Sequence, residues 1–223
     1  MYGVRRNIKK LEKSILKYEE QPVETGRILF YGHSLFTRWS EKWGHRPLEE
    51  DIRMKDGSPA ALNHGFGSST ADDLLYYYHR MVKPYAPRVL VLVAGGNDFP
   101  LGYSAHDVMN NLAKVIDYAQ ADFPGLPVFV LDCKPTPKRN GETNYFTRLR
   151  VEFNQILEDY CKHKENVTFV RTSNLPFLYE KPEDMILPPT VREDIFVEDK
   201  THFNQQGYDY FAEFMREVLD EYL

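Results

Sequence analysis

The apolar run from Val89 to Ala94 is the feature that most restricts how this chain can fold. Its residues show no alternation of apolar and polar side chains, so neither face of such a strand would meet water. Strands of this kind are typical of the centre of a parallel sheet that helices cover on both sides. Because parallel neighbours need long crossover connections, which are usually helical, the run predicts an α/β protein.

The rest of the sequence alternates short apolar strands with amphipathic helices. Further strands are expected at 28–31, 60–62, 128–131 and 167–170. Helical spacing of apolar residues follows most of them and continues in the last segment, from about Gln205. This order predicts a three-layer α/β/α sandwich on a central parallel five-stranded sheet with right-handed crossovers.

The segment before the first strand has its own pattern. Residues 4–20 place apolar side chains at helical spacing, and Gln21-Pro22 ends the pattern. We therefore expect residues 1–22 to be an N-terminal helical appendage and residues 23–223 to be the α/β domain. Two alternatives stay open for the apolar face of this helix: it packs back on the domain, or it forms a homodimer.

Composition restricts the partners of the chain. The formal net charge is -5 and the sequence pI is about 5.8, whereas a general nucleic-acid binder needs a basic face. No apolar run approaches the length of a membrane span, so no integral membrane segment is expected. The basic N-terminus lacks the apolar region of a secretory signal. We therefore predict a cytoplasmic protein.

Metal and cofactor sites are not expected. Most histidines are scattered without ligand spacing, and neither a P-loop nor a dinucleotide-binding glycine motif is present. Cys133 and Cys161 fit the role of buried small apolar residues.

Polar residues gather where the predicted strands end. Ser34, Ser68 and Asn97 follow the first three strands, and Asp199 and His202 precede the last helix. The carboxyl ends of parallel strands share one edge of a sheet, which is where such folds bind ligands. A serine, a histidine and an acid together form the arrangement for acyl transfer. Each residue alone also has an ordinary alternative, such as a helix cap for Ser34 or a turn for Asn97.

Four sequence blocks carry a family resemblance. They are Gly-His-Ser-Leu at 32–35, Asn-His-Gly-Phe-Gly-Ser-Ser-Thr at 63–70, Gly-Gly-Asn-Asp at 95–98 and Asp-Lys-Thr-His at 199–202. In this order the chain resembles the SGNH hydrolases, also called GDSL esterases and lipases, from about residue 27 to its end. The resemblance implies a flavodoxin-like SGNH hydrolase fold.

The resemblance also implies roles for single residues. Ser34 would be the nucleophile, His202 its base, and Asp199 the acid that orients the base. The backbone N–H groups of Ser34 and Ser68 and the side chain of Asn97 would form the oxyanion hole. The implied activity is a serine esterase that hydrolyses a small-molecule ester, with short acyl chains or acetylated carbohydrate as substrates, through an acyl-enzyme and without a cofactor.

Two positions depart from the family pattern. His33 stands where the family has aspartate, and Ser68 stands where it has glycine. A serine resists positive φ far more than a glycine does. The departures support an alternative, namely a catalytically weakened protein that binds a carbohydrate or acyl ligand. Gly67, His33 and His64 lie in or beside the blocks, and we expect them to contact substrate.

Three long loops are expected to wall the pocket. They span residues 36–57, 135–146 and 172–198, and polar or proline-bearing connections of this length are often functional.

Overall fold

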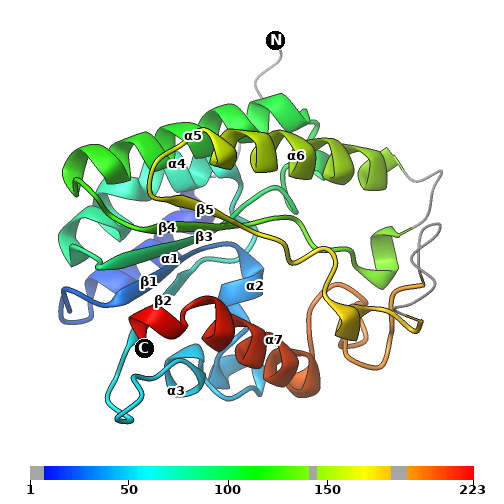
Figure 1. The fold of residues 1–223 in the computed structure, drawn as a ribbon, viewed down its shortest axis with the longest axis horizontal. Helices are drawn as coiled ribbons and strands as arrows, with labels where there is room; N and C mark the ends of the chain where they lie inside the picture. Colours follow the sequence, from blue (N-terminus) through cyan, green and yellow to red (C-terminus); the bar gives the residue numbers. More distant parts are fainter. Residues whose placement is uncertain (1–7, 141–144, 182–189) are drawn as a thin grey trace.

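A five-stranded, all-parallel sheet forms the centre of the protein, as expected. The computed structural model describes residues 8–140, 145–181 and 190–223 (Figure 1). The strand order is β2-β1-β3-β4-β5. The strands are β1 (Ile28–Gly32), β2 (Ala61–Gly65), β3 (Val89–Val93), β4 (Val128–Leu131) and β5 (Val167–Val170).

Helices cover both faces of this sheet and bury two separate apolar cores. In β1, Leu29 and Tyr31 point into one core, and Ile28 and Phe30 point into the other. The first core lies under α1 (Ile8–Glu19), α4 (Ala71–Met81), α5 (Ala105–Asp122) and α6 (Tyr145–Lys162). The second lies under α2 (Ser34–Thr37), α3 (Leu48–Asp51) and α7 (Gln205–Val218). The predicted three-layer sandwich is therefore confirmed.

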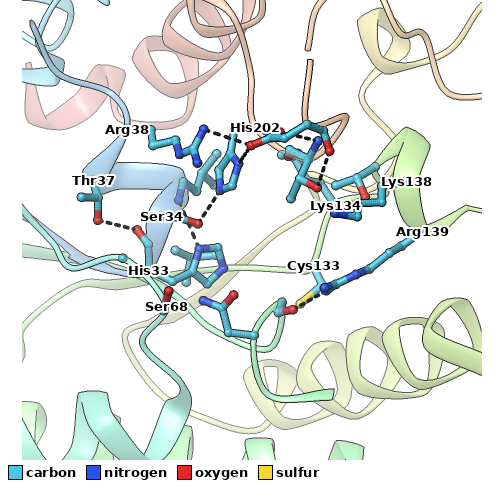
Figure 2. A pocket seen from close by; sticks show the side chains of 18 of the residues that line it. His33, Ser34, Thr37, Arg38, Ser68, Cys133, Lys134, Lys138, Arg139 and His202 are labelled. Atoms are coloured by element: carbon cyan, nitrogen blue, oxygen red, sulfur yellow. Dashed lines mark hydrogen bonds and ion pairs between the residues drawn. The ribbon is translucent and has the colours of Figure 1, made fainter. Parts of the chain in front are cut away.

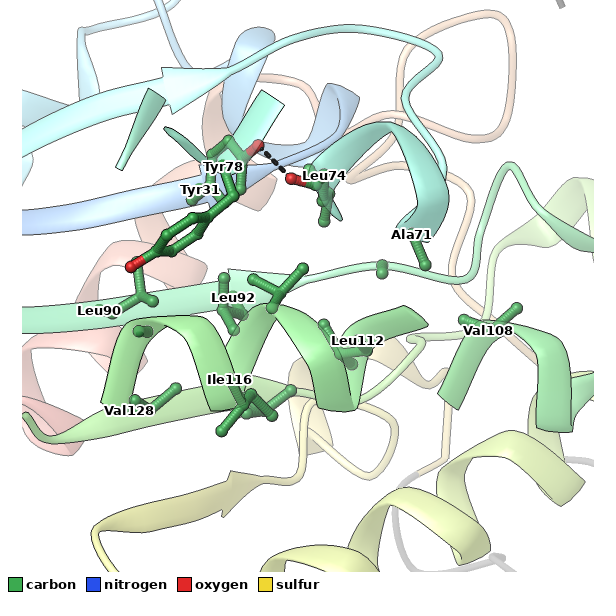
Figure 3. Close-up of a cluster of buried hydrophobic side chains, with 14 of the residues drawn as sticks. Tyr31, Ala71, Leu74, Tyr78, Leu90, Leu92, Val108, Leu112, Ile116 and Val128 are labelled. Atoms are coloured by element: carbon green, nitrogen blue, oxygen red, sulfur yellow. Dashed lines mark hydrogen bonds between the residues drawn. The ribbon is translucent and has the colours of Figure 1, made fainter. Parts of the chain in front are cut away.

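Figure 3 shows part of the first core, where strand side chains meet α4 and α5. Leu90 and Leu92 of β3 pack towards Leu112 and Ile116 of α5. The buried hydroxyl of Tyr31 donates to the carbonyl of Leu74 at 2.7 Å, so its polar atom is paired. Single turns of 3₁₀ helix lie in the connections: η1 (Glu41–Trp43), η2 (Lys83–Tyr85), η3 (Phe99–Leu101), η4 (Pro137–Arg139) and η5 (Pro176–Leu178). A further one, η7 (Asp220–Tyr222), follows α7.

The N-terminal helix α1 packs back on the domain. Leu11 and Ile15 are buried in the first core, and the hydroxyl of Tyr18 donates to the carbonyl of Gly65. Arg80 of α4 pairs with Glu12 and Glu19 of α1. The predicted appendage is thus part of a helical layer, and its apolar side chains Leu11 and Ile15 pack against the rest of the same chain. Residues 4–7, which the prediction placed in the helix, lie outside the described residues.

Strand β2 differs from its prediction. It begins at Ala61 and continues to Gly65, so the first three residues of the second sequence block are strand and not loop. Its register pairs Gly65 with Gly32 of β1. A Cβ on Gly65 would lie 2.4 Å from the backbone nitrogen of Thr37, so glycine permits α2 to approach the sheet.

Within the described residues, no helix is both long enough and apolar enough to cross a membrane.

Candidate active site

A cavity of about 390 Å³ opens at the carboxyl ends of the strands. Seven of the residues predicted from the sequence line it: His33, Ser34, Gly67, Ser68, Asn97, Asp199 and His202. Figure 2 shows the ring of His202 pointing towards Ser34. The structure therefore brings together residues that lie more than 160 positions apart in the chain.

Hydrogen bonds connect Ser34, His202 and Asp199 in one chain. The Nε2 atom of His202 lies 2.8 Å from the Oγ atom of Ser34. On the other side of the ring, Nδ1 lies 2.7 Å from Oδ2 of Asp199. The other oxygen of Asp199 accepts the backbone N–H groups of Thr201 and His202. This carboxylate is therefore fixed, and it favours the tautomer in which Nδ1 carries the proton and Nε2 accepts from the serine.

The position of Ser34 follows from the turn between β1 and α2. The N-cap of α2 is His33, whose Nδ1 accepts the N–H of Leu35 at 3.2 Å. Ser34 is the first helical residue, so its hydroxyl bonds His202 and does not cap the helix. Burial lowers the pKa of His33 to about 3, so this ring is neutral and its proton lies on Nε2.

The surroundings of His202 favour its neutral form, chiefly because the ring is buried. Burial lowers the pKa of His202, and the hydrogen bond that its Nδ1–H donates to Asp199 opposes this effect only in part. Burial raises the pKa of Asp199, but its bonds from His202 and Thr201 outweigh this and lower it to about 2. Arg38 also pairs with Oδ2 of Asp199 at 3.0 Å. A neutral His202 beside an ionised Asp199 can accept the proton of Ser34.

Asn97 is held at the cavity by the turn that contains it. Its side-chain amide donates to the carbonyl of Ser69 at 2.9 Å, which uses one of its two N–H groups. The neighbouring Asp98 is fully buried and accepts the backbone N–H groups of Ala71 and Gly95. This carboxylate ties the turn to the start of α4 and so fixes Asn97 beside the cavity.

The model of the GDSL-like lipase/acylhydrolase family matches residues 30–210 of this sequence. The chain belongs to this family. It is accordingly a hydrolase that acts on ester bonds. None of the curated proteins matches the sequence.

Solved structures share the fold of this chain. A GDSL-like lipase from Bacteroides thetaiotaomicron has a TM-score of 0.70 at 16% identity, and the match covers 97% of this chain and 98% of the lipase chain. A point mutant of an acetyl-xylooligosaccharide esterase from Geobacillus stearmophilus has a TM-score of 0.63 at 16% identity, covering 91% and 96%. A psychrotrophic esterase from Pseudoalteromonas has a TM-score of 0.62 at 17% identity, covering 88% and 98%.

Ser68, the residue that replaces the glycine of the GDSL family, has a left-handed backbone. Its φ is 65°, which L residues other than glycine adopt at a cost of about 1–2 kcal/mol. Ser68 still lines the cavity. The turn thus keeps a conformation that suits glycine, and the serine at this position strains the backbone.

Replacing Ser68 with glycine is therefore expected to stabilise the protein. The change removes a backbone strain of about 1–2 kcal/mol from the folded state. Glycine also has greater conformational freedom in the unfolded chain, which lowers the free energy of unfolding by about 0.4–1 kcal/mol. The net gain of about 0.5–1 kcal/mol corresponds to a rise in Tm of about 1–4 °C for a domain of this size. Calorimetry measures it, with Ser58→Gly in an exposed turn as the control. A lower Tm for Ser68→Gly would contradict the strain.

His64 does not line the cavity, contrary to the expectation from sequence. It lies in β2, and its Nδ1 atom is 2.7 Å from the carbonyl of Met81. Its ring packs against Tyr18 and Tyr85, and burial lowers its pKa to about 4. The residue is part of the packing under α1.

Within the described ranges, no three His, Cys, Asp or Glu side chains are placed to bind a metal ion.

The cavity also contains cationic residues that the sequence patterns did not reveal. These residues are Arg38, Lys134, Lys138, Arg139 and Arg150. Two of the three loops expected to wall the pocket do so, namely 36–57 and 135–146. The described part of the third, 172–198, contributes no lining residue. A signal existed for Lys134, Lys138 and Arg139, since they follow β4 at the same edge of the sheet.

Proposed function

We propose that this protein is a serine esterase that cleaves carboxylic esters through an acyl-enzyme on Ser34. The observation that carries the proposal is the hydrogen-bonded chain from Ser34 through His202 to Asp199 inside a cavity. Nucleophile, base and orienting acid are each within bonding distance of the next, as acyl transfer by a serine requires.

The geometry supports a two-step reaction. The Oγ atom of Ser34 attacks the ester carbonyl carbon while its proton passes to Nε2 of His202. The resulting imidazolium returns the proton to the leaving alcohol, and the acyl group stays on Ser34. Water then attacks the acyl-enzyme by the same route, with His202 again as the base, and the carboxylic acid leaves.

Three donors are proposed to hold the oxyanion that forms in each step. They are the backbone N–H groups of Ser34 and Ser68 and the remaining N–H of the Asn97 side chain. All three residues line the cavity. Loss of one such donor typically lowers the rate by about 10²–10³-fold.

The size of the cavity indicates small substrates. A volume of about 390 Å³ lies at the lower end of the usual range for ligand pockets. We therefore propose a short acyl group or an acetylated carbohydrate as the substrate. The similarity in fold to an acetyl-xylooligosaccharide esterase supports the second class.

The test is hydrolysis of p-nitrophenyl esters from acetate to octanoate between pH 5 and 9. We expect turnover of the short esters with kcat/KM that rises with pH and has its midpoint below pH 6.5. The reason is that His202 must be neutral to act as base, and burial lowers its pKa below the ordinary 6.5. Activity is therefore lost only as the pH falls below that lowered pKa. A midpoint well above 6.5 would contradict this environment of His202.

Labelling separates the esterase from its alternative. A neutral fluorophosphonate should modify Ser34 stoichiometrically, and mass spectrometry of peptides locates the adduct. If the protein shows neither turnover nor labelling, the esterase proposal fails. Saturable binding of a sugar or acyl ligand would then favour the binding protein.

A further inference from the structure

The cavity beside Ser34 has a charge opposite to that of the whole chain. The chain carries a formal net charge of -5. Five basic side chains but only two acidic ones line the cavity, and burial lowers the pKa of one of the five, Lys134, to about 7. A cavity with an excess of positive charge attracts a negatively charged ligand.

Both acidic residues of the cavity are already engaged. Asp199 binds His202 and Arg38. Asp132 is buried and accepts hydrogen bonds from Thr172, Ser173 and Asn154. Neither carboxylate makes an ion pair with the remaining cations of the lining, within the described residues. The excess positive charge is therefore not neutralised by the walls of the cavity.

Arg150 of α6 is the clearest case of an unpaired cation. Its Nε atom is buried and has no hydrogen-bond partner among the described residues. The side chain is part of the cavity lining. A buried N–H group without a partner is unfavourable, and most such groups in native proteins bind water or a ligand.

Arg139 provides a second guanidinium at the same cavity. It donates to the carbonyl of Gly96 at 2.9 Å and lies over the ring of Phe146, as Figure 2 shows for the bond to the turn. Burial lowers its pKa, and no described carboxylate pairs with it. Gly96 precedes Asn97, so this guanidinium lies next to the proposed oxyanion hole.

Lys134, in contrast, has a role within the wall. Its ammonium lies over the rings of Phe196 and Phe203, 4.6 and 4.3 Å from their centroids, and 3.4 Å from the carbonyl of Thr201. These contacts hold the loop that carries His202 against the end of β4. Arg139 makes one hydrogen bond and contacts one ring, and the Nε atom of Arg150 has no partner among the described residues, so both guanidinium groups have N–H donors left for a ligand.

We propose that Arg139 and Arg150 form a subsite for an anionic group of the substrate, so that the enzyme prefers esters bearing a carboxylate or phosphate. The inference rests on the proposed esterase and names its substrate class. Guanidinium groups match both oxyanions, because each presents paired N–H donors to two oxygens. Charge-assisted hydrogen bonds of this kind change kcat/KM by about tenfold to a hundredfold.

The test compares two matched pairs of esters. Monomethyl glutarate against methyl pentanoate places a carboxylate on the acyl side, and 2-acetoxyethyl phosphate against 2-acetoxyethanol places a phosphate on the alcohol side. Each reaction releases an acid that a pH-stat measures. We expect the charged member of at least one pair to have a kcat/KM higher by about tenfold to a hundredfold, and that pair identifies the group and its side.

Variants then assign this preference to the arginines. Arg139→Gln and Arg150→Gln are each expected to lower the ratio of charged to neutral ester at least about tenfold, and Arg150→Lys to retain part of it. Lys114→Gln, an exposed charge change on α5 outside the cavity, is the control and should keep the ratio. A ratio near one in both pairs, or a ratio that neither arginine variant lowers, would overturn the proposal.

Failure of this subsite is distinguishable from failure of the esterase. Turnover of the neutral esters without a charge preference removes the subsite alone. If no ester is hydrolysed, the esterase fails, and calorimetric titration of the same pairs into Ser34→Ala then tests the subsite. Tighter binding of a charged member, lost on adding Arg150→Gln, supports it, and equal binding of both members overturns it.

Discussion

Replacing Ser34 with alanine is expected to lower kcat for short esters by at least about 10⁴-fold, the effect typical of losing a serine nucleophile. The variant keeps the cavity and the oxyanion donors but has no oxygen that can form the acyl-enzyme. The fold should remain, because the Ser34 hydroxyl bonds His202 while His33 caps α2. Hydrolysis of p-nitrophenyl acetate and butyrate, with circular dichroism and Tm, measures both effects.

Ser40→Ala is the matched control for this variant. Ser40 lies six residues further along the chain and donates to the carbonyl of Thr37 at 2.9 Å, outside the cavity lining. It removes the same hydroxyl without touching the proposed chemistry, so activity should stay within a few-fold of that of the unaltered protein. If Ser34→Ala keeps more than a tenth of the activity while Ser40→Ala behaves as expected, an acyl-enzyme on Ser34 is wrong.

The fold could be predicted because the apolar pattern of each strand indicates whether its two faces are buried. The run at 89–94 is apolar on both sides, and the structure places its alternate residues in two different cores. The end of β2 could not be predicted in the same way, because hydrophobicity stops at Leu62. The polar Asn63 continues the strand since its side chain donates to the carbonyls of Phe36 and Trp39. That compensation is tertiary and leaves no local pattern.

The residues of the candidate site also fall into two groups, those that a local sequence pattern could mark and those that it could not. Ser34 and Asn97 follow strands, and His202 precedes a helix, so a sequence motif at each strand or helix end could mark them. Arg150 lies within α6, where the apolar spacing reports the core face and says nothing of a cavity. His64 is the reverse case, since it lies inside a motif but its side chain packs under α1. Position in a motif therefore predicted the backbone better than the side-chain direction.

Replacing Asp199 with asparagine is expected to lower kcat by about 10⁴-fold, although the change alters only one atom of the side chain. An asparagine oxygen can still accept the backbone N–H groups of Thr201 and His202, which Oδ1 of Asp199 accepts now. The new amide N–H₂ then faces Nδ1 of His202 in place of the acceptor Oδ2. His202 must accept there and carry its proton on Nε2, so it can no longer take the proton of Ser34.

Two readouts distinguish this tautomer change from general damage to the site. Labelling of Ser34 by the fluorophosphonate needs the same base, so its rate should fall in parallel with kcat. Asp220→Asn, which removes an exposed charge paired with Lys55, is the control and should keep both rates. A fall of less than about tenfold in Asp199→Asn would mean that the carboxylate does not set the tautomer of His202. The bond of 2.7 Å between them would then position the ring without activating it.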